Sequence, residues 1–209
     1  MKNCLCTFLI AFMMLFLVLG VSAHALSTSD SPMDDLGFEA SPLSRVTGDT
    51  VIHFPDPNFD AAVRALIGKL EGNIIVSDVV GMTELDVSDL DIADLTGIEY
   101  FTALTELHCA YNALTTLDLS GNPALRVLNC EANYLTELDF SQNAQLTELY
   151  CGLSGLTTLN VSQCPLLKEL DCVEGGLTAL DVSHNPALEG LLLYNNELTV
   201  LDVSHNPAL

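Results

Sequence analysis

Cysteines recur every 21 residues through the middle of this chain, at positions 109, 130, 151 and 172. The residues around them repeat with the same period. From Thr83 to Leu209 the sequence divides without remainder into one unit of 22 residues and five of 21, and each unit ends in leucine. A fixed period of this length indicates a stack of equivalent units, each in contact with its neighbours, and not one globular core.

A single unit cannot fold alone. In the second unit six side chains are expected to point inward: Leu107, Cys109, Leu114, Leu117, Leu119 and Leu125. Their burial contributes on the order of 10 kcal/mol, whereas ordering a unit costs roughly 20 to 40 kcal/mol of conformational entropy. Stacking lets each unit bury both flanks and pair its strand with the next one. The apolar spacing matches the leucine-rich repeat, with cysteine in the third apolar position of four units. We therefore predict a leucine-rich-repeat solenoid over residues 83–209, an α/β repeat with a parallel sheet on its concave side.

Two segments precede the part that is expected to fold. Lys2, the apolar residues 8–21 and the sequence Ala23-His24-Ala25 predict a signal peptide over residues 1–25. The alternative is an uncleaved anchor helix, for which the apolar run is short. Residues 26–50 are rich in Ser, Asp and Pro and lack apolar periodicity, which predicts a flexible leader.

Residues 51–82 predict a small helical cap over the first unit. Asp56 suits the N-cap of a helix, Pro57 its first position and Gly68 its end. Ser77 is expected to cap a second, shorter turn. At the other end Leu209 completes a unit, so we expect the C-terminal cap to be missing and the open end to permit self-association.

The cysteine ladder at Cys109, Cys130, Cys151 and Cys172 is expected to project into the core. Equivalent residues of stacked strands lie about 4.8 Å apart, and parallel Cβ vectors at that distance fit a disulfide poorly. Reduced thiols that pack as small apolar groups are therefore favoured, with disulfides or a metal site as alternatives. Cys164 replaces an asparagine found in four other units, so we expect it on a turn, within reach of reagents.

The chain is strongly acidic. It has 28 acidic residues and six lysines or arginines, for a formal net charge of −22, and removal of Lys2 with the signal peptide gives −23. Such a charge repels phosphate backbones and anionic lipid headgroups. We therefore expect neither nucleic acid nor, after signal removal, a membrane as a partner. Basic protein patches or divalent cations suit the chain better.

No catalytic constellation emerges from the sequence. The segment 89–94, "DLDIAD", has the acidic start of a calcium loop but lacks its central glycine and final glutamate. Asn160 stands where sister units carry aspartate, so we interpret it as a substitute for that aspartate. His184 and His205 share a turn position and have no His, Cys or Glu partner at a fixed offset. We predict that the chain is not an enzyme and has no cofactor and no metal site, although weak calcium binding along the rows of acidic residues stays open.

The helical segment "FPDPNFDAAVRALIGK", followed by units of the type "LTxLDVSxNPALxxLxC", resembles the internalin-type surface proteins of bacteria, in particular those with 21-residue units and a cysteine ladder. The resemblance covers residues 51–209. It implies an exported bacterial protein, since internalin-like proteins are exported and the better-known ones bind host or matrix proteins through the concave sheet. Ser154 and Gly175 depart from the turn asparagine of the other units, which weakens the expected backbone support there. The immunoglobulin-like region and wall-sorting signal of the family are not found, so the mode of anchorage stays open.

The concave face is where strand alternation places outward side chains. Ten of them form the predicted ligand-binding set: Glu106, His108, Asn129, Glu131, Glu148, Tyr150, Glu169, Asp171, Leu192 and Tyr194. One interpretation is that the glutamates only keep the protein soluble. The other is an acidic rim around Tyr150, Leu192 and Tyr194 that anchors a basic protein partner.

Three classes of function remain open on these observations. We predict a binding or adhesion module, secreted or held at the bacterial cell surface. The alternatives are the repeat arm of a larger secreted enzyme and a structural surface protein that associates with itself. Sequence beyond Leu209 separates them, because a catalytic domain supports the enzyme arm, whereas spacer domains and a wall anchor support the adhesion module.

Overall fold

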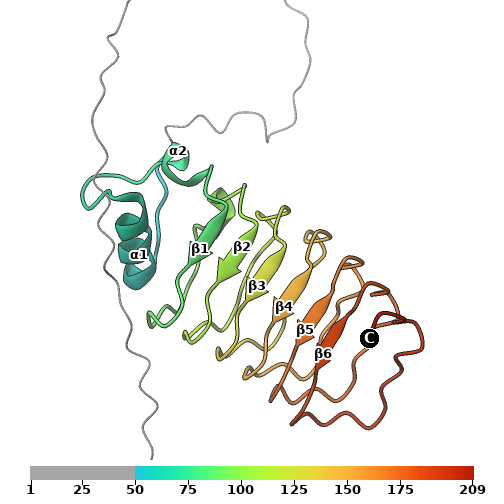
Figure 1. Ribbon diagram of the computed structural model, residues 1–209. Helices are drawn as coiled ribbons and strands as arrows, with labels where there is room; N and C mark the ends of the chain where they lie inside the picture. The colour runs from blue at the N-terminus through green and yellow to red at the C-terminus, as the bar shows by residue number, and fades with distance from the viewer. Residues whose placement is uncertain (1–49) are drawn as a thin grey trace, which may run out of the picture. The chain divides into compact units, whose positions relative to one another are not determined.

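The computed structural model describes residues 50–209 (Figure 1). The predicted signal peptide and nearly all of the predicted leader lie outside these residues. Six short strands stack side by side in chain order and point the same way, with two helices beside the first of them. The predicted leucine-rich-repeat solenoid is confirmed. The segments that return from one strand to the next are turns, apart from one turn of 3₁₀ helix, η2 (Ile98–Tyr100), in the first unit.

The cap begins with helix α1 (Pro57–Ile67), which starts and ends where the sequence predicts. The Asp56 carboxylate accepts hydrogen bonds from the first turn, and Gly68 ends the helix with a left-handed φ of 68°. Helix α2 (Val76–Val79) differs from the prediction. Its N-cap residue is Ile75, whose N–H donates to the Asp78 carboxylate at 2.8 Å. Ser77 therefore lies inside the first turn and does not cap it.

One parallel sheet holds the six strands in sequential order. The strands are β1 (Glu84–Asp86), β2 (Glu106–His108), β3 (Val127–Asn129), β4 (Glu148–Tyr150), β5 (Glu169–Asp171) and β6 (Gly190–Leu192). The register pairs each central leucine with the next one, Leu107 with Leu128 for example, so every step along the sheet equals one repeat. The short strands and fixed register follow from the period, because a one-residue slip would expose every core side chain.

A single apolar core runs from the cap to the fifth unit. At its start the rings of Phe54, Phe59 and Phe101 pack together, with centroids 4.9 to 6.5 Å apart. The cap therefore covers the flank of the first unit as predicted. One side chain departs from expectation, since Leu117 is only half-buried.

Two columns of asparagines support the turns, and all of these asparagines are buried except Asn196, which is half-buried. In the first, Asn112, Asn133 and Asn196 bind backbone groups of their own unit and the preceding one. Asn133, for example, donates to the Cys109 and Cys130 carbonyls at 3.0 Å and accepts from the Leu114 N–H at 3.0 Å. An asparagine side chain thus replaces the hydrogen bonds that a regular ladder would supply.

This first column is interrupted in the fourth and fifth units, as the sequence predicts. Ser154 bonds only the Gly152 carbonyl of its own unit, at 3.3 Å. Gly175 has no side chain to contribute. At the junction of these two units the backbone bond runs instead from the Thr178 N–H to the Thr157 carbonyl at 3.2 Å. The path of the return loop therefore changes at this junction.

The second column holds Asn122, Asn143, Asn185 and Asn206, and Cys164 occupies its place in the fourth unit. Contrary to our expectation, Cys164 is fully buried. The asparagines at this position turn inward and donate to backbone carbonyls. Asn185, for example, donates to the Val161 and Cys164 carbonyls at 2.9 and 2.8 Å. A residue at this position therefore faces the core. The Cys164 thiol reaches only the Asn143 carbonyl, at 3.9 Å. The side-chain oxygens of the four asparagines in this column are buried and have no hydrogen-bond partner among residues 50–209. Cysteine at this position has no such oxygen to bury.

None of the helices formed by residues 50–209 is long and apolar enough to cross a lipid bilayer.

Candidate functional site

The outer side of the sheet, which we call the concave face, carries the first and last residue of every strand. The structure places eight of the ten predicted binding residues there: Glu106, His108, Asn129, Glu148, Tyr150, Glu169, Asp171 and Leu192. The central residue of each of the first five strands is buried, whereas the flanking residues are exposed or half-buried. Their lateral order is fixed by the register, which sets Glu148 beside Glu169 and Tyr150 between Asn129 and Asp171.

Tyr150 lies at the centre of the acidic part of this face. Its hydroxyl donates to Oε2 of Glu148 at 3.1 Å. Burial raises the pKa of Tyr150, and the bond to Glu148 and the charges of Glu148, Glu169 and Asp171 raise it further. The ring is thus a half-buried aromatic surface of fixed orientation among carboxylates.

Glu169 has room for its carboxylate because the next strand begins with glycine. A Cβ atom at Gly190 would collide with the Glu169 carboxylate, which lies over that backbone. The neighbouring Glu148 and Glu169 repel each other by roughly 0.8 kcal/mol at 5 Å in water. The repulsion opposes folding slightly, so stability alone does not favour this pair of glutamates.

The remaining two predicted residues lie just beyond the strands, and their surroundings differ. Tyr194 is 61% exposed. Glu131 is partly buried, and this burial, together with the charge of Asp171, raises the pKa of its carboxyl group. In the two units between Glu131 and Tyr194, the equivalent residues Gly152 and Val173 are buried. The third row of side chains is therefore interrupted, and Tyr194 stands apart from Glu131.

Two of the predicted residues also shape the ends of strands. The side-chain oxygen of Asn129 accepts the Glu131 N–H at 3.1 Å, and that of Asp171 accepts the Val173 N–H at 3.0 Å. Such Asx turns compete with continued strand pairing and end the strand. Sequence reasoning assigned these two side chains to ligand binding alone and missed this structural use.

No lysine or arginine lies on the concave face in the part of the chain that is described. Residues 50–209 contain four lysines or arginines. Arg64 and Lys69 lie in the cap, and Arg126 and Lys168 directly precede β3 and β5. Arg64 and Lys69 pair with Asp60 and Asp78, and Lys168 pairs with Glu189. The carboxylates of the concave face are therefore uncompensated.

Sequence reasoning missed a set of exposed apolar side chains beside this face: Tyr111, Tyr134 and Leu153, which are 60%, 68% and 40% exposed. Tyr111 and Leu153 occupy the same place in their units, three residues after the strand, and both have a left-handed backbone. Comparing that position across the units would have drawn attention to them, because the equivalent residues include Asp89, Ala132 and Asn195.

The four thiols of the cysteine ladder are buried behind the concave face. Cys151 and Cys172 lie in contact, with their sulfur atoms 3.6 Å apart, beyond the 2.05 Å of a disulfide bond. Burial raises the pKa of Cys109 to about 12. Buried thiols with a raised pKa are weak nucleophiles and pack as small apolar side chains.

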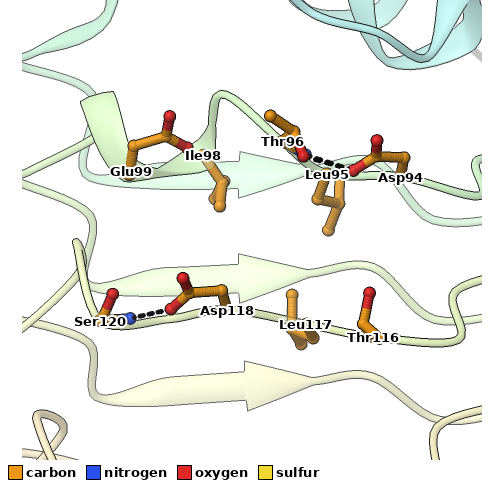
Figure 2. A pocket seen from close by; sticks show the side chains of 9 residues that line it. All are labelled: Asp94, Leu95, Thr96, Ile98, Glu99, Thr116, Leu117, Asp118 and Ser120. Carbon is orange, nitrogen blue, oxygen red and sulfur yellow. Dashed lines mark hydrogen bonds between the residues drawn. The ribbon is translucent and has the colours of Figure 1, made fainter.

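A cleft of about 360 Å³ lies between the return loops of the first two units (Figure 2). Leu95, Ile98 and Leu117 give it apolar walls, and Asp94, Glu99 and Asp118 line it with carboxylates. Each carboxylate accepts a backbone N–H of its own turn, as Asp118 does from Ser120 at 2.9 Å. Within residues 50–209 no three His, Cys, Asp or Glu side chains are arranged to hold a metal ion.

Comparison with known proteins agrees with this architecture. The model of the leucine-rich-repeat domain of the endo-β-N-acetylglucosaminidase EndoS matches residues 54–206. Internalin J of Listeria monocytogenes serotype 4b (strain F2365) is 45% identical over 71 residues, which are 33% of this chain and 8% of that protein. The chain thus spans only a small part of that relative's length.

Two solved structures share the fold. One is an internalin of Listeria monocytogenes strain 4b F2365, with a TM-score of 0.66 at 24% identity, over 73% of this chain and 46% of that one. The other is a leucine-rich-repeat protein of Leptospira interrogans, with a TM-score of 0.60 at 23% identity, over 64% and 37% of the two chains. The chain is internalin-like in its fold, and it belongs to the leucine-rich-repeat family represented by the domain of EndoS.

Proposed function

We propose that this chain is an exported bacterial protein that binds a protein partner with a basic patch through its concave face. The observation that carries the proposal is the set of Glu148, Tyr150, Glu169 and Asp171, which the register places side by side on a face without lysine or arginine. Export rests on the predicted signal peptide. Adhesion at the cell surface and the absence of catalysis are part of the same proposal.

The chemistry of this set favours a cationic protein surface. Exposed carboxylates act over a distance of about 8 to 10 Å at physiological salt and steer an oppositely charged partner toward the face. A half-buried tyrosine supplies a contact that excludes water once the partner has docked. The acidic residues thus govern the rate of association, and Tyr150 governs how long the complex lasts.

Binding kinetics test this division. After the partner has been identified with the full-length protein, Tyr150→Ala is expected to speed dissociation with little change in association. The pair Glu148→Gln and Glu169→Gln is expected to slow association and to reduce its dependence on salt. Asp139→Asn and Asp181→Asn on the return loops serve as controls. If these controls weaken binding and the concave variants do not, the proposed face is wrong.

The repeat arm of a larger secreted enzyme is the second candidate, and one observation favours it. The matching family model describes a domain of an enzyme. In that case the concave face would position the enzyme on its target, and the chemistry would reside in another domain. Expression of the complete coding sequence decides the point, because a catalytic domain joined to these repeats would replace the adhesion proposal.

A further inference from the structure

The edge of the sheet at which the strands end carries three large apolar side chains on three successive units. We call Tyr111, Tyr134 and Leu153 the tyrosine edge. The loops that bear them are joined by backbone hydrogen bonds, from the Tyr111 N–H to the Glu131 carbonyl at 2.9 Å and from the Ala132 N–H to the Gly152 carbonyl at 3.0 Å. With about 4.8 Å between units, the edge extends over roughly 10 Å, enough for a short peptide segment.

Folding does not account for these residues. In every unit the residue at the position of Tyr111 and Leu153 has a left-handed φ between 51° and 57°. Asp89 and Asn195 hold this position in the first and last units and tolerate that conformation, whereas tyrosine and leucine do not favour it. Tyr111 is 60% exposed and Leu153 is 40% exposed, so neither side chain belongs to the buried core. Their value must come from contacts outside the chain.

The electrostatic surroundings of the edge are acidic. Asp89, Glu131 and Glu174 lie along it, and the described cations nearest to the sheet, Arg126 and Lys168, precede the strands at the opposite edge. Glu131 is the carboxylate between the exposed side chains of the second and fourth units. An apolar surface beside unpaired carboxylates fits a partner that is both apolar and basic.

We propose that the tyrosine edge docks an extended, basic amphipathic segment of a partner protein. Its apolar side chains pack on Tyr111, Tyr134 and Leu153, and its lysines or arginines face Glu131 and the acidic concave face. This inference rests on the proposed function and deepens it, because it states the side from which the partner reaches the sheet and the kind of segment that makes the contact.

The test uses two synthetic peptides of equal charge, one of alternating lysine and leucine and one of alternating lysine and serine. The double variant Tyr111→Asn and Tyr134→Ala replaces each tyrosine with a residue that a sister unit carries at that position, Asn195 and Ala113. Its thermal stability is therefore expected to match the wild type. Leu70→Ser, in the cap, is the control, because Leu70 is also an exposed apolar residue, at 76%.

The Lys-Leu peptide is expected to bind the wild type more tightly than the Lys-Ser peptide, and the double variant is expected to lose about tenfold in affinity for it. Affinity for the Lys-Ser peptide stays unchanged, and Leu70→Ser behaves as the wild type. Equal binding of the Lys-Leu peptide by the wild type and the double variant would overturn the inference. An equal loss in Leu70→Ser would also overturn it, because the contact would then be unspecific.

Three further outcomes bear on this inference and on the proposed function. If Tyr150→Ala weakens binding of both peptides while the double variant does not, the edge is wrong and the concave face stands. If neither weakens binding, both fail. If sedimentation without peptide shows self-association that the double variant abolishes, the edge serves a second copy of this chain, and a basic partner segment is excluded.

Discussion

Asp56 shows how one buried side chain joins two parts of the molecule. Its Oδ1 accepts the N–H groups of Asn58 and Phe59 at 2.8 and 3.1 Å and so caps α1. Its Oδ2 accepts the N–H groups of Ala93 and Asp94 in the first repeat, at 2.8 and 3.3 Å. Sequence reasoning identified the first role from the position before Pro57. The second depends on how the cap docks and left no signal in the local sequence.

Replacement of Asp56 by alanine is expected to destabilise the protein by about 2 to 4 kcal/mol, because it removes the helix cap and leaves buried N–H groups without partners. Asp56→Asn keeps an acceptor for α1 but turns an amide N–H₂ toward Ala93 and Asp94. Asp56→Asn is expected to lower the free energy of unfolding by about half as much as Asp56→Ala. Denaturant unfolding measures both, and equal stability of the wild type and Asp56→Ala would contradict the double role.

The same carboxylate predicts a pH dependence. Burial alone would raise the pKa of Asp56, but its four backbone hydrogen bonds outweigh this effect and lower the pKa below its ordinary value of 3.8. A depressed folded pKa contributes stability that is present above 3.8 and is lost as the pH falls through the folded value. The difference in unfolding free energy between wild type and Asp56→Asn should therefore be constant from pH 7 to about 4.5 and shrink below pH 4.

Thiol reactivity tests the burial of the cysteines. All five cysteines within residues 50–209 are buried and free, and burial raises the pKa of Cys164 to about 11. A water-soluble alkylating reagent should therefore label none of them in the native protein and all five after unfolding, as counted by mass spectrometry. Selective labelling of Cys164 in the native state would contradict its place in the second asparagine column.

At the scale of elements, the sequence predicted what the repeat period controls. Strand register, the sequential parallel order and the bounds of α1 all follow from apolar spacing and capping residues. It failed where tertiary contacts decide. Ser77 suited an N-cap by type, but Asp78 performs that role from inside the helix. Cys164 was assigned to the surface because asparagine is common in turns, although here the turn faces the core.

The interrupted asparagine column leaves the turns of the fourth and fifth units with less side-chain support than those of the second and third. In Ser154→Asn the new side chain would reach the Cys130 and Cys151 carbonyls and the Leu135 N–H, by analogy with Asn133. We expect a gain of about 1 to 2 kcal/mol. Amide hydrogen exchange over residues 151–177, which should be the fastest region between the cap and the last unit, is expected to slow. Ser154→Ala, which cannot form these bonds, is the control and should give no gain.

At the scale of the whole molecule, each unit is stable only because neighbours cover both of its flanks. The cap covers the first unit with Phe54 and Phe59, whereas the outer flank of the sixth unit is exposed within residues 50–209. Val203 is 42% exposed there, although its equivalents Leu119 and Val182 are at most 1% exposed. The candidate binding site could be predicted from the same periodicity as far as the strands extend. Beyond the strands, comparison of the units points to Tyr111 and Leu153, whereas the exposure of Tyr134 depends on loop geometry and could not be predicted.

A polypeptide that is made to end at Leu209 is expected to associate with itself in a manner that depends on concentration and salt. In that polypeptide Val203 and Leu209 present the apolar columns that join units elsewhere in the stack, so two copies can cover each other's flanks. The formal charge of −22 opposes this contact, and salt that screens the repulsion should strengthen it. Sedimentation should show a mass that rises with protein and salt concentration.

Two variants of this polypeptide locate the contact. Val203→Glu should stay monomeric, because the added carboxylate would lose its hydration in the contact. Val200→Glu adds the same charge at a position that is 78% exposed and that Glu137 occupies in the third unit, so it should associate like the unmodified polypeptide. If the unmodified polypeptide stays monomeric at high protein and salt concentration, this flank is not an association surface.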